Sequence, residues 1–188
     1  MSVEFLFDYA SPWSFLADAI LPRSLPGIAV RKRPVYLRGF SSFAQGMPYG
    51  PEKLAYQGRD FLRCVAHEGV MVAMPSNFPI NGVHLLRGAL AAEREGVFDR
   101  FHEAAFRATW QESKDVSDRA VAAAIAREIS PAVAEGMDDP AIKERLRAET
   151  ADAVARGAFG VPSFFVGDEL FWGHDRLPYV ARALTPTR

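Results

Sequence analysis

Residues 3–16 have the sequence VEFLFDYASPWSFL, which joins a strand pattern directly to the start of a helix. The first six of these residues alternate and are rich in large apolar side chains, as β-strands are. Ser11 and Pro12 mark the helix start, because serine is a favoured N-cap and proline suits the first helical position. The stretch therefore predicts a strand that ends just before a helix N-terminus.

The helix that starts at Pro12 continues with apolar side chains at helical spacing and ends near Pro22 and Pro26. Residues 28–35 then have the composition of a second strand. A helix between two strands is the usual beginning of a βαβ unit, so the first part of the chain predicts an α/β fold.

The middle of the chain predicts a block of helices. A loop-like stretch opens this block, and Ser, Asp and Pro residues separate the segments with helical periodicity. No strand-like run interrupts them. The predicted helices span 52–65, 83–95, 97–110, 118–129 and 140–156.

Strand patterns return at the end of the chain. Residues 161–166 and 169–172 are separated by Gly167-Asp168 and predict a β-hairpin. Residues 175–184 predict a last amphipathic helix. The whole order is βαβ, then helices, then ββα.

This order predicts an α/β protein with a thioredoxin fold (βαβ…ββα) and a large all-helical insertion. Residues 1–39 and 158–188 would form the thioredoxin-like domain, and residues 40–157 would form the insertion.

Composition limits the functions to consider. A hydrophobic content of 49% is enough for a buried core, and a net charge of −1 offers no field for nucleic acid or anionic membranes. No apolar run reaches the roughly 18 residues that span a bilayer, and the first residues lack a secretory signal pattern. Cys64 is the single cysteine, so no intrachain disulfide can form and a cytoplasmic location is expected. The four histidines have no metal-site spacing.

The tetrapeptide Ser11-Pro12-Trp13-Ser14 lies where thioredoxin-like redox proteins have Cys-x-x-Cys. Two serines exclude dithiol chemistry at this position. A serine hydroxyl at a helix N-terminus can still donate a hydrogen bond to a thiolate that a bound cofactor supplies. The alternative is that Ser11 is only an N-cap.

Two stretches near the end of the chain are candidates for ligand binding. Val161-Pro162 enters a strand, and a cis bond there would leave the N–H and C=O of Val161 free for an extended peptide; an ordinary edge-strand proline is the alternative. The helix start beyond Gly173 would attract a carboxylate, while Asp175 would pair with an ammonium group. An acidic residue that only favours the helix start is equally consistent with Asp175.

Together these stretches resemble the 2-hydroxychromene-2-carboxylate isomerase family, relatives of kappa-class glutathione transferases in the DsbA-like thioredoxin superfamily. The likeness covers nearly the whole chain and is most specific at its two ends. The matching stretches are 7–17 (FDYASPWSFLA), 78–81 (FPIN), 159–162 (FGVP) and 171–177 (FWGHDRL).

The resemblance implies glutathione as cofactor. Ser11 would be the catalytic serine, hydrogen-bonded to the glutathione sulfur. Val161, before Pro162, would bind the cysteinyl backbone, and His174 and Asp175 would meet the γ-glutamyl end.

Two further glutathione contacts are expected by the same resemblance, at Lys53 and Asp60, although solvated helix charges are the alternative. On the substrate side, Trp13 and Trp172 would provide aromatic surface and Asn81 a polar anchor. The other aromatic candidates for that side are Tyr9, Phe43 and Phe78.

The implied function is a glutathione-dependent isomerase of a conjugated aromatic 2-oxo acid or hydroxychromene carboxylate, which acts by reversible thiolate addition. The implied partners are a small aromatic substrate and a second copy of the chain in a homodimer. Two alternatives stay open: a kappa-like glutathione transferase or peroxidase, and a non-catalytic thioredoxin-fold binding module.

Overall fold

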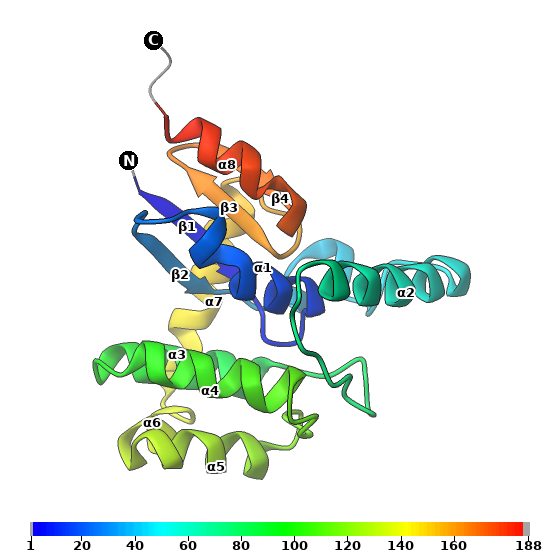
Figure 1. Cartoon of the computed structure of the whole chain (residues 1–188). Helices are drawn as coiled ribbons and strands as arrows, with labels where there is room; N and C mark the ends of the chain where they lie inside the picture. Colours follow the sequence, from blue (N-terminus) through cyan, green and yellow to red (C-terminus); the bar gives the residue numbers. More distant parts are fainter. Residues whose placement is uncertain (1, 186–188) are drawn as a thin grey trace.

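The computed structural model describes residues 2–185, which contain a four-stranded mixed sheet in the order β2-β1-β3-β4 (Figure 1). Strand β2 pairs with β1 in parallel, and β3 pairs with β1 on its other side in antiparallel orientation. The hairpin partner β4 forms one edge. The strands are β1 (Val3–Phe7), β2 (Val30–Pro34), β3 (Ser163–Val166) and β4 (Glu169–Trp172).

Helices connect the strands in the predicted order. Helix α1 (Pro12–Ser24) joins β1 to β2, and α8 (Leu177–Ala183) follows the hairpin. Between β2 and β3 lie α2 (Pro51–His67), α3 (Val83–Arg94), α4 (Phe98–Trp110), α5 (Arg119–Ile129), α6 (Pro131–Gly136) and α7 (Pro140–Ala155). Short 3-10 helices are η1 (Leu37–Gly39), η2 (Ser41–Phe43) and η3 (His174–Arg176).

The two faces of the sheet are covered by different helices. Side chains alternate along β1, so Phe5 and Phe7 belong to the core beneath α1 and α8, while Leu6 points to the opposite face. On that face Leu6 packs in a separate cluster with Phe165 and with Ala153 of α7. Figure 1 shows α1 in front of the sheet and α7 passing behind it.

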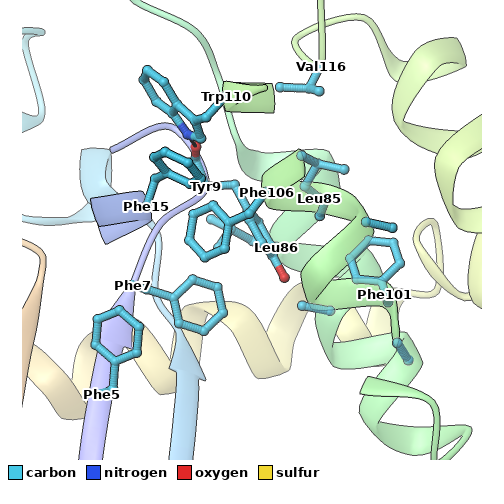
Figure 2. Packing of buried hydrophobic residues seen from close by; sticks show 14 of the residues in the cluster. Phe5, Phe7, Tyr9, Phe15, Leu85, Leu86, Phe101, Phe106, Trp110 and Val116 are labelled. Atoms are coloured by element: carbon cyan, nitrogen blue, oxygen red, sulfur yellow. Dashed lines mark hydrogen bonds between the residues drawn. The ribbon is translucent and has the colours of Figure 1, made fainter. Parts of the chain in front are cut away.

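The main core continues from the sheet into the helical block. Phe7 and Tyr9 both contact Phe106 of α4, with ring centroids 5.8 and 4.8 Å apart (Figure 2). Trp110 is fully buried and donates a hydrogen bond from Nε1 to the backbone oxygen of Tyr9 at 2.8 Å. These contacts fix the turn between β1 and α1 against α4.

The division into two domains stays a prediction: residues 1–39 with 158–188, and residues 40–157. Residues 1 and 186–188 lie outside the described part. Across the predicted boundary, helix α7 contacts β2. From residue 2 to residue 185, no helix combines the length and the apolar character that crossing a membrane requires.

Candidate functional site

A cavity of about 790 Å³ lies at the end of β1 where α1 begins. Its walls come from the β1–α1 turn, the segment after β2, one side of α2, the loop before α3 and the β4–η3 junction. The structure brings most of the predicted site residues to this cavity. Those that line it are Ser11, Trp13, Asn81, Val161, Pro162, Trp172, His174 and Asp175.

Ser11 is both an N-cap and a cavity residue. Its Oγ accepts a hydrogen bond from the backbone N–H of Ser14 at 3.1 Å, which caps α1. The side-chain hydrogen finds no acceptor among residues 2–185, although Ser11 is only 4% exposed. The hydroxyl can therefore donate to a ligand, at the end of the helix where the backbone dipoles favour negative charge.

Asp8 lies in the cavity wall beside this turn. Its two carboxylate oxygens accept from the backbone N–H groups of Ala10 at 2.9 Å and Leu37 at 2.8 Å. Burial raises the pKa of the Asp8 carboxyl to about 6, against the lowering effects of these N–H groups and of Arg38. A β-carbon at Gly82 would overlap the Asp8 carboxylate, so only glycine fits there.

The Val161–Pro162 peptide bond is cis, which is one of the two conformations that the sequence leaves open. The ladder between β3 and β1 begins at Ser163, and no hydrogen bond between described residues uses the N–H or C=O of Val161. The next carbonyl, that of Pro162, accepts from Gly173 N at 2.9 Å. Val161 thus offers one free donor and one free acceptor beside the cavity.

The imidazole of His174 stacks on Trp13, with ring centroids 4.9 Å apart and planes 15° from parallel. Burial lowers the pKa of His174 below 6.5, and the carboxylate of Asp175 partly offsets this. Asp175 itself pairs with Arg176 at 3.3 Å. A neutral imidazole and an indole therefore form one flat wall of the cavity.

Asn81 and Trp172 line the cavity in different ways. Asn81 Oδ1 accepts from Val83 N at 3.1 Å at the start of α3, so the side-chain amide nitrogen is the group that remains for a ligand. Trp172 is 44% exposed and its ring centroid lies 5.0 Å from that of Phe159.

Lys53 and Asp60 lie on α2 but do not line the cavity. The Lys53 ammonium sits 4.3 Å from the centroid of the Tyr49 ring, and Asp60 pairs with Arg63 at 3.5 Å. Their predicted contacts with glutathione stay predictions. Cys64, on the same helix, also lies outside the lining, and burial raises the pKa of its thiol.

One aromatic expectation is wrong. Tyr9 does not face the substrate side, because it is fully buried and its hydroxyl lies 3.0 Å from His102 Nδ1. Phe43 and Phe78 do line the cavity. No pattern in the sequence points to several other lining residues, since they come from loops or from one side of a polar helix: Asp8, Tyr36, Arg38, Met47, Tyr49 and Gln57.

A family profile described as the DSBA-like thioredoxin domain matches residues 2–185. The chain belongs to this family. The 2-hydroxychromene-2-carboxylate isomerase of Sphingobium xenophagum is 29% identical over 190 residues, which cover 95% of each chain. Human glutathione S-transferase kappa 1 is 24% identical, over 97% of this chain and 90% of its own.

A solved structure of a 2-hydroxychromene-2-carboxylate isomerase matches with a TM-score of 0.82 and 27% identity, over 98% of this chain and 94% of its own. The predicted resemblance is therefore confirmed, as is the thioredoxin fold with its helical insertion. The chain is an enzyme like the 2-hydroxychromene-2-carboxylate isomerases. The roles predicted for individual site residues stay predictions.

Proposed function

We propose that the chain is a cytoplasmic, glutathione-dependent isomerase of a conjugated aromatic 2-oxo acid or hydroxychromene carboxylate. One observation carries the proposal: the free hydrogen of the Ser11 hydroxyl and the free backbone edge at Val161 share one cavity. The relatives named 2-hydroxychromene-2-carboxylate isomerase and glutathione S-transferase kappa support the reaction class and the cofactor.

The residues in the cavity fit glutathione. The free N–H and C=O of Val161 suit the backbone of a tripeptide, which can add there as a short strand. The Asp175 carboxylate suits the ammonium group of the γ-glutamyl end. The chain's own thiol, Cys64, lies outside the lining, so the sulfur has to come from a ligand.

When bound, glutathione would supply a thiolate nucleophile for reversible addition to the conjugated double bond, which is the chemistry that permits rotation about that bond. The Ser11 hydroxyl would stabilise the ionised sulfur by donating a hydrogen bond to it. The positive end of the α1 helix dipole would favour the negative charge as well. A cysteine-type thiol has a pKa of about 8.5, so lowering it by one to two units raises the thiolate fraction at pH 7 severalfold or more. The stacked Trp13 and His174 rings provide a flat surface beside the sulfur site.

The proposal predicts that Ser11→Ala lowers glutathione-dependent kcat/KM about 100-fold, the usual cost of one lost charge-stabilising donor. The thiol pKa of bound glutathione should rise, as followed by the ultraviolet absorbance of the thiolate against pH. Asp118→Ala is the matched control, because its side chain caps α5 by accepting from Ala120 N at 2.7 Å and does not line the cavity. It removes a cap worth about 1 kcal/mol and should keep full activity.

Full glutathione-dependent activity in Ser11→Ala would remove the hydroxyl from the mechanism. Calorimetry that detects no binding at millimolar glutathione would instead favour the non-catalytic module. A kappa-like transferase uses the same site but consumes glutathione, whereas an isomerase returns it. Measuring free thiol before and after turnover separates the two enzymes, and sedimentation tests the expected homodimer.

A further inference from the structure

Arg38 is a cation that lines the cavity. Two arginines line the cavity, and the other one, Arg176, pairs with Asp175 at 3.3 Å. Arg38 is exposed and forms no ion pair within residues 2–185. The nearby Asp8 accepts from two backbone N–H groups, and no ion pair joins its carboxylate to Arg38. The guanidinium therefore has its donors available to a ligand.

Arg38 and Val161 lie next to strands that pair with opposite edges of β1. Arg38 lies in η1 just after β2, and Val161 comes just before β3. Strands β2 and β3 pair with opposite edges of β1, and both segments lie at the end of β1 that leads to Ser11. A peptide on the Val161 edge with its sulfur at Ser11 would leave the Arg38 guanidinium for the second reactant.

The backbone that carries Arg38 is fixed relative to Ser11. The N–H of Leu37 donates to Asp8 Oδ2 at 2.8 Å, and the carbonyl of Asp8 accepts from Ser11 N at 3.0 Å. One buried residue thus connects η1 to the turn that carries the hydroxyl. The charge of Arg38 also opposes the larger effect of burial on the pKa of Asp8. The guanidinium therefore lies within electrostatic range of this turn.

We propose that Arg38 binds the carboxylate of the electrophilic substrate in the cavity that Ser11 and Val161 also line. This inference rests on the proposed function and names the group that selects its substrate. A guanidinium matches a carboxylate in a bidentate, charge-assisted pair. Phe43 and Tyr49 from the same segment line the cavity and provide apolar surface for an aromatic ring.

The kinetic test compares two substrates that differ only in the carboxylate: o-hydroxybenzylidenepyruvate and the neutral ketone o-hydroxybenzylideneacetone. Arg38→Ala should lower kcat/KM for the acid about 10- to 100-fold, chiefly through KM, and leave the ketone unchanged. Arg38→Lys keeps the charge but loses the two parallel N–H donors of the guanidinium, so its kcat/KM for the acid should lie between those of the wild type and Arg38→Ala. Arg59→Ala, which removes an exposed arginine of α2 outside the lining, is the matched control.

A binding test needs no turnover. Calorimetry with S-methylglutathione present should show that Arg38→Ala loses affinity for phenylpyruvate about 10- to 100-fold, with no change for phenylacetone or for glutathione itself. Equal losses for acid and ketone, a loss confined to glutathione, or no binding of phenylpyruvate by the wild type would overturn the inference. Arg38-dependent binding of phenylpyruvate without any isomerisation would uphold it and defeat the proposed function.

Discussion

Asp8 shows how one buried residue organises the candidate site. Its carboxylate accepts from the N–H groups of Ala10 and Leu37, and its backbone carbonyl accepts from Ser11 N. An ionised group without water costs free energy, so burial raises the pKa of the carboxyl to about 6. The same group therefore has a measurable effect on the pH dependence of stability.

The folded protein should lose stability relative to Asp8→Asn as the pH rises from about 4 to 7. The native state binds the Asp8 proton more tightly than the unfolded chain, because the pKa rises from 3.8 to about 6. The stabilisation is complete below pH 3.8 and is lost as the pH passes 6, and at 1.36 kcal/mol per unit it amounts to about 3 kcal/mol. Urea unfolding of both proteins at several pH values measures the difference.

Asp168→Asn, in the exposed turn between β3 and β4, controls for the loss of one charge. A gap between wild type and Asp8→Asn that stays constant, or widens in favour of the wild type at higher pH, would contradict the assignment. In Asp8→Asn the side-chain NH2 group faces one of the two backbone N–H groups, so that N–H loses its acceptor. This loss lowers the free energy of unfolding of the variant by about 1–3 kcal/mol at every pH.

The difference between Ser11 and Asp8 explains which site residues the sequence can reveal. Ser11 can be recognised from the sequence, because serine at the N-cap followed by proline at the first helical position is a local pattern of helix starts. Asp8 is not, since its environment depends on Leu37 and Gly82, which lie far from it in sequence. Arg38 cannot be recognised from the sequence for the same reason, because the cavity that it lines is formed only in the folded chain.

At the scale of elements, a chain of polar side chains connects the β1–α1 turn, α4, α1 and β2. His102 Nε2 lies 3.0 Å from Asp18 Oδ1, and Lys32 pairs with the same oxygen at 2.7 Å. Although burial alone raises the pKa of Asp18, His102 and Lys32 outweigh it and keep the carboxyl ionised. Burial lowers the pKa of His102, so its ring carries a single hydrogen. The ionised Asp18 accepts that hydrogen from Nε2, and Nδ1 accepts from the Tyr9 hydroxyl at 3.0 Å.

Tyr9→Phe should lower the free energy of unfolding by about 1–3 kcal/mol, because it leaves the buried Nδ1 of His102 without a donor. Tyr56→Phe is the matched control: Tyr56 is 52% exposed and its hydroxyl lies 3.5 Å from Asp60, so a change within about 0.5 kcal/mol is expected. Urea titrations of the three proteins provide the comparison. Equal effects of the two substitutions would show that the buried chain adds nothing to the contact between α4 and the sheet.

Periodic elements are predictable and irregular ones are not. The helix predicted at 140–156 is α7 (Pro140–Ala155), and the hairpin predicted at 161–166 and 169–172 is β3 (Ser163–Val166) with β4 (Glu169–Trp172). Helix α6 (Pro131–Gly136) was not expected, because six residues are too few to establish a helical period. The segment with η1 and η2 contributes to the cavity wall. Its short turns have no hydrophobic periodicity, so the sequence does not predict its conformation.

At the scale of the whole molecule, the buried guanidinium of Arg33 joins the sheet to α7. It donates to Glu4 Oε2 of β1 at 2.7 Å, to Glu149 Oε2 at 2.6 Å and to Asp152 Oδ2 at 2.9 Å. Glu149 and Asp152 are more than a hundred residues away from Arg33 along the chain. The cluster therefore connects the beginning of the fold to the last helix before the hairpin.

Arg33→Met should destabilise the protein by about 3–5 kcal/mol at neutral pH, since it leaves partly buried carboxylates without their shared cation. Arg31→Met is the matched control, because Arg31 is exposed and lies 3.9 Å from Glu4 and 4.0 Å from Glu149. Its loss should cost less than about 1 kcal/mol. Denaturant unfolding of both variants beside the wild type measures these differences.

Acid should reduce the deficit of Arg33→Met. Burial raises the pKa of Glu4, but hydrogen bonds from Arg33 and Arg156 outweigh it, so the folded-state pKa lies below the 4.5 of a free carboxyl. A depressed pKa gives stability that is present above pH 4.5 and is lost as the pH falls through the folded value. The gap between wild type and variant should therefore narrow below about pH 4.5. A gap that is the same at pH 3 and pH 7 would mean that Arg33 acts through packing rather than charge, and that α7 is held to the sheet by its apolar contacts alone.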